Sequence, residues 1–210
     1  MKVISTNLGA PTKIIWNGKK TSTGIYKFPV ESPLLLDIED VQGDTVVDRK
    51  HHGGIYKACY LFAADHYPYW KEKYPHLKWD WGMFGENLTM EGLDESQIKI
   101  GSIYKLGTAM VQITQPREPC YKLGIRFGDQ GILKQYIDHG FPGTYVRVVE
   151  RGTVTVGDSM ELVEESKSPL TVQQFYNFIF SPKKDQELAQ QVIHNPAIPL
   201  SKREKFKKWA

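Results

Sequence analysis

Residues 109–120 read AMVQITQPREPC and combine a strand with a candidate site. The first six residues are a short, mostly apolar run, which predicts a β-strand. The last six form a loop stiffened by two prolines, and Pro119 pushes Glu118 toward an extended backbone. We therefore expect a strand that opens into a rigid polar loop carrying Cys120.

Short runs of the same kind recur through about the first 165 residues. Gly, Pro, Asp and Asn separate them, as turn-forming residues do. Many short strands at this spacing predict a barrel or a sandwich. The predicted strands are residues 3–6, 13–16, 45–47, 57–62, 102–106, 109–114, 145–149 and 159–163.

Two helices are predicted within this strand-rich part. One covers about residues 64–74, with Pro68 in the first turn, where proline is tolerated. The other covers about residues 132–139 and is followed by Gly140, a common residue at a helix C-terminus. The first part of the chain is therefore expected to be mainly β with a few helices.

The pattern changes after residue 166, where the apolar residues take up helical spacing. Thr171 is placed to cap the first of these helices. We therefore expect a β domain over residues 1–166 and a small three-helix unit over residues 167–210. The three predicted helices are 171–179, 185–194 and 201–209.

Composition and charge argue against several classes of protein. Hydrophobic residues make up 40% and charged residues 24%, which is typical of a globular protein. The net charge is +3, but the last ten residues hold five cations and one glutamate, so the other 200 sum to −1. This distribution argues against a nucleic-acid-binding face. There is no apolar run of membrane-spanning length and no signal peptide, so we expect no membrane contact and a cytoplasmic location.

Cys120 is the main candidate for chemistry, and the other cysteine is Cys59. Arg117 and Lys122 place two cations near the Cys120 thiol, and neighbouring positive charge favours a thiolate. A thiolate is both a nucleophile and a soft-metal ligand. The alternative role, a small buried hydrophobic residue, fits Cys59 in its apolar run 58–62 better.

The segment DRKHHGGIYK, residues 48–57, has the chemistry of an anion site. Its cations and imidazoles suit a phosphate, and its glycines let backbone N–H groups approach a ligand closely. Zinc fits poorly, because adjacent histidines on a strand point to opposite faces. An exposed hairpin turn is the alternative. The residues concerned are Arg49, Lys50, His51, His52, Gly53 and Gly54.

The segment GMFGENLT, residues 82–89, carries a polar trio after two glycines: Glu86, Asn87 and Thr89. The amide of Asn87 can donate and accept hydrogen bonds, as recognition of a heterocycle edge requires. An Asx turn explains the same segment equally well.

Three segments in this order, residues 48–54, 82–89 and 115–120, resemble the MOSC domain family, named for its place at the C-terminus of molybdenum-cofactor sulfurase. The likeness is greatest to the stand-alone bacterial, YiiM-type members. In those, a MOSC-type β-barrel with a few helices is followed by a short helical unit. The three helices expected over residues 167–210 agree with this organisation, so the resemblance covers nearly the whole chain.

The resemblance implies a molybdenum cofactor (Mo-molybdopterin), with Cys120 as the catalytic residue and the protein's sulfur ligand to molybdenum. Family members with catalytic activity reduce N-hydroxylated compounds, such as hydroxylamino purines, to amines. Pyridoxal phosphate is not required for such a reaction. The residues that the resemblance assigns to cofactor binding are Arg49, His51, His52, Gly53, Gly54, Asn87, Thr89, Arg117 and Lys122.

Partners and alternatives follow from the same residues. Two cysteines cannot hold a four-cysteine iron–sulfur cluster, so we expect a separate electron-donor protein alongside the small-molecule substrate. The apolar residues of 175–180 leave two possibilities open, a homodimer interface and burial against the barrel. Two other functions also stay open: a sulfur carrier with a persulfide on Cys120, and a non-catalytic cofactor-binding protein.

Overall fold

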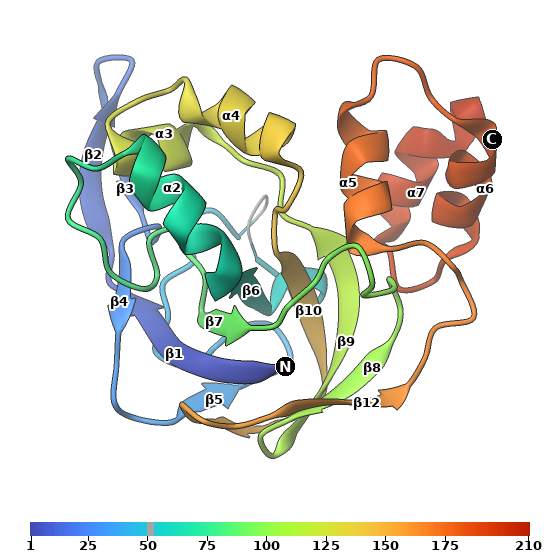
Figure 1. Cartoon of the computed structure of the whole chain (residues 1–210), viewed down its shortest axis with the longest axis horizontal. Coiled ribbons are helices and arrows are strands. Elements are labelled where there is room, and N and C mark those ends of the chain that lie inside the picture. Colours follow the sequence, from blue (N-terminus) through green and yellow to red (C-terminus); the bar gives the residue numbers. More distant parts are fainter. Residues whose placement is uncertain (50–52) are drawn as a thin grey trace.

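The computed structural model describes residues 1–49 and 53–210. Its centre is an eight-stranded sheet, antiparallel except where β6 and β7 run parallel. Figure 1 shows the strands curling through the lower part of the molecule, with helices above them. In order across the sheet the strands are β12 (Met160–Glu164), β8 (Ile103–Leu106), β9 (Ala109–Pro116), β10 (Thr144–Glu150), β6 (Cys59–Ala63), β7 (Leu88–Glu91), β1 (Lys2–Gly9) and β4 (Lys27–Pro29).

The sheet curls until β12 meets the start of β1, but it does not close. Lys2 and Ser159 form an isolated bridge, and the N–H of Met160 donates to the carbonyl of Met1 over 2.9 Å. No full ladder joins these two strands within the described residues. The same edge of β1 pairs with β4 only from Asn7 onward. The mainly β class is confirmed, and the expected closed barrel is corrected to an open, strongly curled sheet.

Two smaller sheets flank the large one. In the first, β5 (Leu34–Leu36) pairs with β11 (Gly152–Val154). In the second, β2 (Thr12–Trp16) and β3 (Lys19–Thr23) form a hairpin around Asn17 and Gly18, whose φ angles are 48° and 72°. Positive φ at both turn residues is the conformation that an Asn-Gly pair favours in two-residue hairpins. Figure 1 shows this hairpin rising at the upper left, away from the sheet.

Strand β6 lies between two hydrophobic clusters, which explains why all five of its residues are buried. Side chains alternate along a strand. Cys59 and Leu61 therefore join the apolar cluster inside the curled sheet, whereas Tyr60 and Phe62 join an aromatic cluster under the helices. The expectation that Cys59 is a core residue is confirmed.

The five predicted helices are confirmed to within a few residues. Thr171 forms a complete capping box with Gln174 at the start of the helix 172–180, and Asp185 caps the helix 186–194. Gly140 ends the helix 132–139 in a left-handed conformation. The helices that lie wholly within the described residues are η1 (Ile55–Lys57), η2 (Ala64–His66), α2 (Tyr67–Lys73), α3 (Tyr121–Phe127), α4 (Ile132–His139), α5 (Val172–Phe180), α6 (Gln186–His194), α7 (Leu200–Phe206) and η3 (Lys207–Trp209).

The strand predicted over residues 45–47 is wrong. These residues form an irregular loop that crosses directly over Gly24. A Cβ atom on Gly24 would lie 1.9 Å from the carbonyl oxygen of Thr45, so only glycine permits this approach. The strand predicted over 57–62 begins later, at Cys59, because a 3-10 turn occupies Ile55–Lys57.

Helices α5–α7 make up residues beyond 166, as expected, and pack against the sheet (Figure 1). Phe175, Val192 and Phe206 belong to the same hydrophobic cluster as the inner face of the sheet. The division into two domains at residue 166 stays a prediction. Within the described residues, no helix has both the length and the apolar character to cross a bilayer.

Candidate functional site

A pocket opens beside the C-terminal end of β9. Its walls come from segments that are distant in the sequence: the base of the hairpin, the irregular loop near residue 46, strand β6 and the start of α3. The lining residues used below are Gly24, Lys27, Asp44, Asp48, Lys57, Tyr60, Asn87, Arg117, Cys120, Lys122 and Tyr145.

A β-bulge at the end of β9 turns the chain toward this pocket. In the ladder with β10, Tyr145 pairs with Gln115 but Val146 pairs with Ile113, so Thr114 is the extra residue. The Thr114 hydroxyl donates to the carbonyl oxygens of Tyr56 (2.8 Å) and Tyr145 (3.0 Å), which fixes the bulge. The strand ends at Pro116, and the next residue, Arg117, lines the pocket.

Cys120 lies at the end of this loop, just before α3. It is partly buried, has an extended backbone (φ −131°), and lines the pocket. The ring of Tyr121 stacks on Trp16 of the hairpin with 4.6 Å between centroids. The segment that carries the thiol is therefore held between α3 and the hairpin.

Arg117 places a buried cation in the wall of the pocket. Its guanidinium lies 5.2 Å from the ring centroid of Tyr60 and 5.8 Å from that of Tyr136. Its Nη1 atom is buried and has no hydrogen-bond partner within the described residues. Because a buried charge is stable only when it is paired and hydrogen-bonded, this arrangement is suited to an anionic ligand.

The hydroxyls of the two tyrosines support this arrangement. Tyr60 and Tyr136 lie 3.0 Å apart at their oxygens, and each donates to the carbonyl of Pro142 over 2.8 Å. Their aromatic faces are thereby fixed beside Arg117. Burial raises the pKa of the Tyr60 phenol, so it stays neutral.

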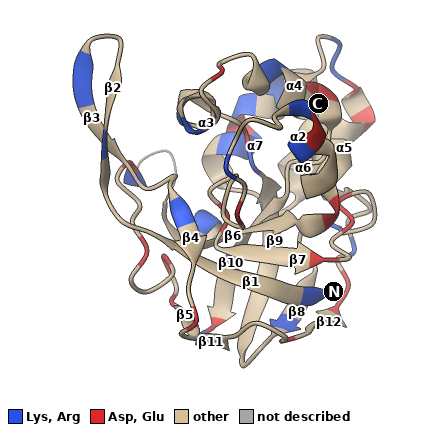
Figure 2. Ribbon diagram, turned by 60° about the vertical axis from the view of Figure 1, so that its left-hand side comes forward, with Lys and Arg blue, Asp and Glu red and all other residues tan. Residues whose placement is uncertain are grey.

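Two lysines add positive charge near Cys120. Lys57 lies 5.6 Å from the ring centroid of Tyr145, and burial, followed by the nearby Lys202, lowers its pKa. Lys122 is only 8% exposed. Figure 2 shows basic residues at the start of β4 and on α3, in the region of the pocket.

The acidic side chains of the pocket offset this charge only in part. Lys27, at the start of β4, forms an ion pair with Asp44. Asp48 is the second carboxylate of the lining. The lining also contains four basic residues: Lys27, Lys57, Arg117 and Lys122. Basic residues therefore outnumber acidic residues in the pocket lining.

Asn87 lines the pocket, but its side-chain amide is engaged within the protein. Its Nδ2 donates to Asp44 over 3.0 Å and to the carbonyl of Asn7 over 3.5 Å, and its Oδ1 accepts from the N–H of Tyr60 over 3.2 Å. We interpret Asn87 as the residue that joins the Lys27–Asp44 pair to β6. Its contact with a cofactor stays a prediction.

Other predicted cofactor residues lie elsewhere. The hydroxyl of Thr89 donates to the buried Glu86 (2.9 Å) and accepts from Asn7 (3.1 Å), away from the pocket lining. Arg49 forms ion pairs with Asp40 (2.8 Å) and Glu39 (3.2 Å) at the surface.

The remaining predicted residues belong to the glycine-rich segment. Gly53 and Gly54 precede η1 and are not among the residues that line the pocket. His51 and His52 lie outside the described residues. The anion-binding role of this segment therefore stays a prediction.

Sequence reasoning missed several pocket residues: Lys27, Asp44, Tyr60 and Tyr145. Tyr60 could have been found, because alternation along β6 places it opposite the buried Cys59. No local pattern marks Lys27 and Asp44, whose pairing depends on tertiary contacts.

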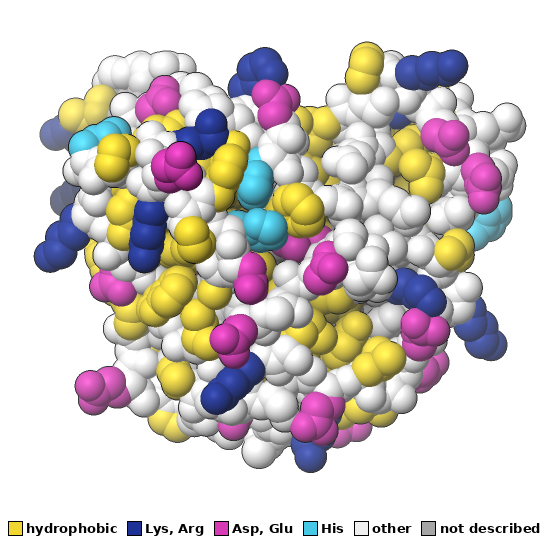
Figure 3. All heavy atoms as spheres, viewed as in Figure 1, with side chains coloured by type: hydrophobic (Ala, Val, Ile, Leu, Met, Phe, Trp, Pro, Cys, Tyr) yellow, Lys and Arg dark blue, Asp and Glu magenta, His cyan; other side chains and the backbone are white. Residues whose placement is uncertain are grey.

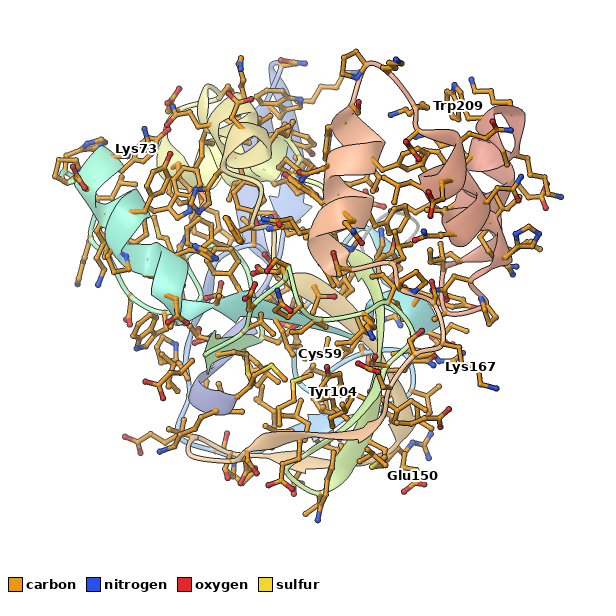
Figure 4. The ribbon with its side chains drawn as sticks, turned by 45° about the vertical axis from the view of Figure 1, so that its right-hand side comes forward. Cys59, Lys73, Tyr104, Glu150, Lys167 and Trp209 are labelled. Atoms are coloured by element: carbon orange, nitrogen blue, oxygen red, sulfur yellow. The ribbon has the colours of Figure 1, made fainter. Side chains whose placement is uncertain are left out.

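Cys59 differs from Cys120 in its exposure to solvent. It is fully enclosed among the strands, where Figure 4 labels it, and burial raises the pKa of its thiol well above the usual range. It is therefore an inert thiol. The described residues contain no cluster of three or more His, Cys, Asp or Glu side chains able to hold a metal ion by themselves.

Comparison with known proteins identifies the family to which this fold belongs. The MOSC domain matches residues 48–161, and the chain belongs to the MOSC domain family. The uncharacterized protein YflK of Bacillus subtilis (strain 168) is 36% identical over 206 residues, which cover 98% of this chain and 93% of YflK. The resemblance drawn from the three sequence segments is confirmed.

Two further relatives describe the family around this chain. The crystal structure of YiiM from Geobacillus stearothermophilus has a TM-score of 0.82 and 30% identity, covering 99% of this chain and 98% of that one. A Gibberella moniliformis (strain M3125 / FGSC 7600) protein named Reductase is 34% identical over 150 residues, which cover 70% of this chain and 27% of that protein.

Proposed function

We propose that this chain binds the molybdenum cofactor and reduces N-hydroxylated compounds to amines, with Cys120 as the sulfur ligand of the metal. The observation that supports this most directly is that Cys120 shares one pocket with Arg117, Lys57 and Lys122. A thiolate suits a soft metal, and a group of cations suits a phosphate. Membership of the MOSC family and the relative named Reductase support the same proposal.

The residues present fit such a cofactor. Arg117 Nη1, which has no partner among the described residues, gains an acceptor if a phosphate enters the pocket, and Lys122 in the same lining is a second donor. The rings of Tyr60 and Tyr145 give the pocket an aromatic wall. When bound, the cofactor supplies the redox chemistry that amino-acid side chains lack.

The overall reaction requires a source of electrons. A hydroxylamine R–NHOH takes up two electrons and two protons, its N–O bond breaks, and R–NH₂ and water are released. The chain has only two cysteines, one of them enclosed in the core, and so has no four-cysteine cluster as an electron store. The electrons in this proposal come from a separate protein.

The test compares two cysteine variants purified from cells that make the cofactor. Bound molybdenum and reduction of a hydroxylamino purine by a chemical reductant are measured for the wild type, for Cys120→Ala and for Cys59→Ala. We expect Cys120→Ala to lose turnover while Cys59→Ala, matched in chemistry but outside the pocket, keeps it. Full activity of Cys120→Ala contradicts the proposal.

A sulfur carrier is the second candidate, because Cys120 is the single sulfur in the pocket lining and is partly exposed. An accessible thiol is what persulfide chemistry requires. Mass spectrometry separates the two functions: a labile extra sulfur atom on Cys120, with no bound metal, supports the carrier. Bound cofactor without turnover would instead indicate a non-catalytic binding protein.

A further inference from the structure

The β2–β3 hairpin is an exposed basic element next to the pocket. Residues 12–23 contain Lys13, Lys19 and Lys20 and no acidic residue. The whole chain has 27 basic and 24 acidic residues, so outside the hairpin the two kinds are equal in number. Within the described part of the chain, none of these three lysines forms an ion pair.

The outer side of the hairpin combines this charge with an apolar residue. Ile15 pairs with Lys20 across the two strands and Lys13 pairs with Ser22, so the side chains of Lys13, Ile15 and Lys20 share one face. Ile15 is 69% exposed. We call Lys13, Ile15 and Lys20 the basic hairpin face. This face therefore offers a partner positive charge together with one exposed apolar side chain.

The inner side of the hairpin leads to the candidate site. Trp16 stacks on Tyr121, the residue directly after Cys120. At its base, β3 continues into Thr23 and Gly24, which line the pocket. In Figure 2 the hairpin stands clear of the rest of the molecule at the upper left, so a partner can reach its outer side.

The basic C-terminal helices differ from the hairpin, because several of their cations are engaged. Lys202 binds Glu118 over 2.6 Å and Lys207 binds Glu204 over 2.6 Å. Lys208 lies 4.1 Å from the ring centroid of Trp209. By contrast, the hairpin lysines form no ion pair within the described residues and stay solvent-facing cations next to the pocket's edge at Thr23 and Gly24.

We propose that the basic hairpin face docks the electron donor, and that this donor is a small acidic redox protein carrying flavin. This inference rests on the proposed function, because only a reductase needs such a donor. The donor is oxidised by two electrons per turnover, and R–NHOH with two protons is reduced to R–NH₂ and water. Opposite charges steer the encounter, and the exposed isoleucine supplies apolar contact area.

The test measures binding of an acidic flavodoxin to the full chain by surface plasmon resonance. Lys13→Glu combined with Lys20→Glu is expected to slow association about tenfold or more at low salt, with a smaller difference at high salt. Ile15→Ser is expected to speed dissociation. The matched control combines Lys105→Glu with Lys183→Glu, the same charge change on exposed residues of β8 and of the α5–α6 loop (Figure 1).

Three results would overturn the docking proposal. The first is no flavodoxin binding by the wild type, and the second is an equal loss in the control variant. The third is binding of single-stranded RNA, in place of flavodoxin, that the hairpin changes abolish.

A parallel assay separates this proposal from the proposed function. Hairpin variants that turn over with dithionite at the wild-type rate but accept electrons slowly from flavodoxin support docking at the hairpin. If they accept electrons from flavodoxin as fast as the wild type, only the docking proposal fails. If the molybdenum-loaded wild type does not turn over with dithionite, the proposed function fails and the donor role fails with it.

Discussion

Gly24 shows how a single missing side chain shapes the pocket. A methyl group there would meet the backbone of Thr45, which cannot rotate away as a flexible side chain can. We expect Gly24→Ala to displace the loop over the pocket and to lower the free energy of unfolding by about 1–3 kcal/mol. Cofactor binding should weaken as well.

Urea unfolding and molybdenum content measure these two effects. The matched control is Gly131→Ala, where the added Cβ would meet only the end of the Asp129 side chain. It should change both quantities little. Equal effects of the two substitutions would contradict the assigned role of Gly24.

His139 makes stability depend on pH. Burial, together with the neighbouring His66 and Lys73, lowers its pKa to about 4 from 6.5. Its ring stacks on Tyr69 and its Nε2 lies 3.3 Å from His66 Nδ1, and Figure 3 shows adjacent histidine side chains near the centre of this face. Because the folded pKa is the lower one, its contribution to stability is complete above pH 6.5 and is lost as the pH falls toward 4.

We therefore expect His139→Phe, which keeps a stacking ring, to lose less stability than the wild type between pH 7 and pH 4. Urea unfolding at several pH values measures this. His194→Phe, at the exposed end of α6, is the control and should keep the wild-type slope. An unchanged slope for His139→Phe would count against the assignment.

At the residue scale, sequence alone separated the two cysteines, because one lies in an apolar run and the other in a rigid polar loop with cations. The sequence could not predict the partners of Arg49, whose side chain forms ion pairs with Asp40 and Glu39 at the surface instead of lining the pocket. Such a choice between partners is made by tertiary contacts and leaves no local pattern.

At the scale of elements, α7 is tied to the loop that carries the thiol. Lys202 Nζ lies 2.6 Å from Glu118 Oε1, two residues before Cys120, and 5.5 Å from the ring centroid of Phe175. Burial opposes ionisation of Glu118, but Lys202 outweighs it and lowers the pKa of that carboxyl. The ion pair therefore helps to fix the position of Cys120.

We expect Lys202→Met to lower the free energy of unfolding by about 1–3 kcal/mol and to speed labelling of Cys120 by a thiol reagent. Because Cys59 is enclosed, the labelling rate reports on Cys120 alone. Lys207→Met, which breaks an exposed pair with Glu204, is the control and should change little. Slow, unchanged labelling of Lys202→Met would refute the link.

Elements with a strong local signal were predictable, and the others were not. Thr171, as a capping residue, predicted the start of α5, and Gly140 predicted the end of α4. The second strand of the hairpin was missed although Asn17-Gly18 marks its turn. The short helix α3 and the loop at 45–47 depend on tertiary packing, which local propensity does not encode.

At the scale of the whole molecule, one hydrophobic cluster joins the sheet to α5–α7. We therefore expect the full chain to unfold in a single transition, with circular dichroism and tryptophan fluorescence coinciding. A chain truncated to residues 1–166 should aggregate, because it exposes the surface that Phe175 and Phe206 cover. Two separate transitions would instead support independent domains on either side of residue 166.

The family could be recognised from the sequence because three separated segments together are more specific than any one of them. The degree of closure of the sheet could not be predicted from the sequence. It depends on how far the two ends of the sheet approach each other along β1, which is a property of the assembled sheet.

The enclosed guanidinium of Arg117 links folding to metabolism. A ligand that binds only the folded state raises its stability in proportion to the logarithm of ligand excess. If the proposed cofactor neutralises this charge, a cell that stops making the cofactor leaves the chain unfolded for a larger fraction of the time and open to proteolysis. The amount of the protein in the cell would then follow the supply of its cofactor without any control of its synthesis.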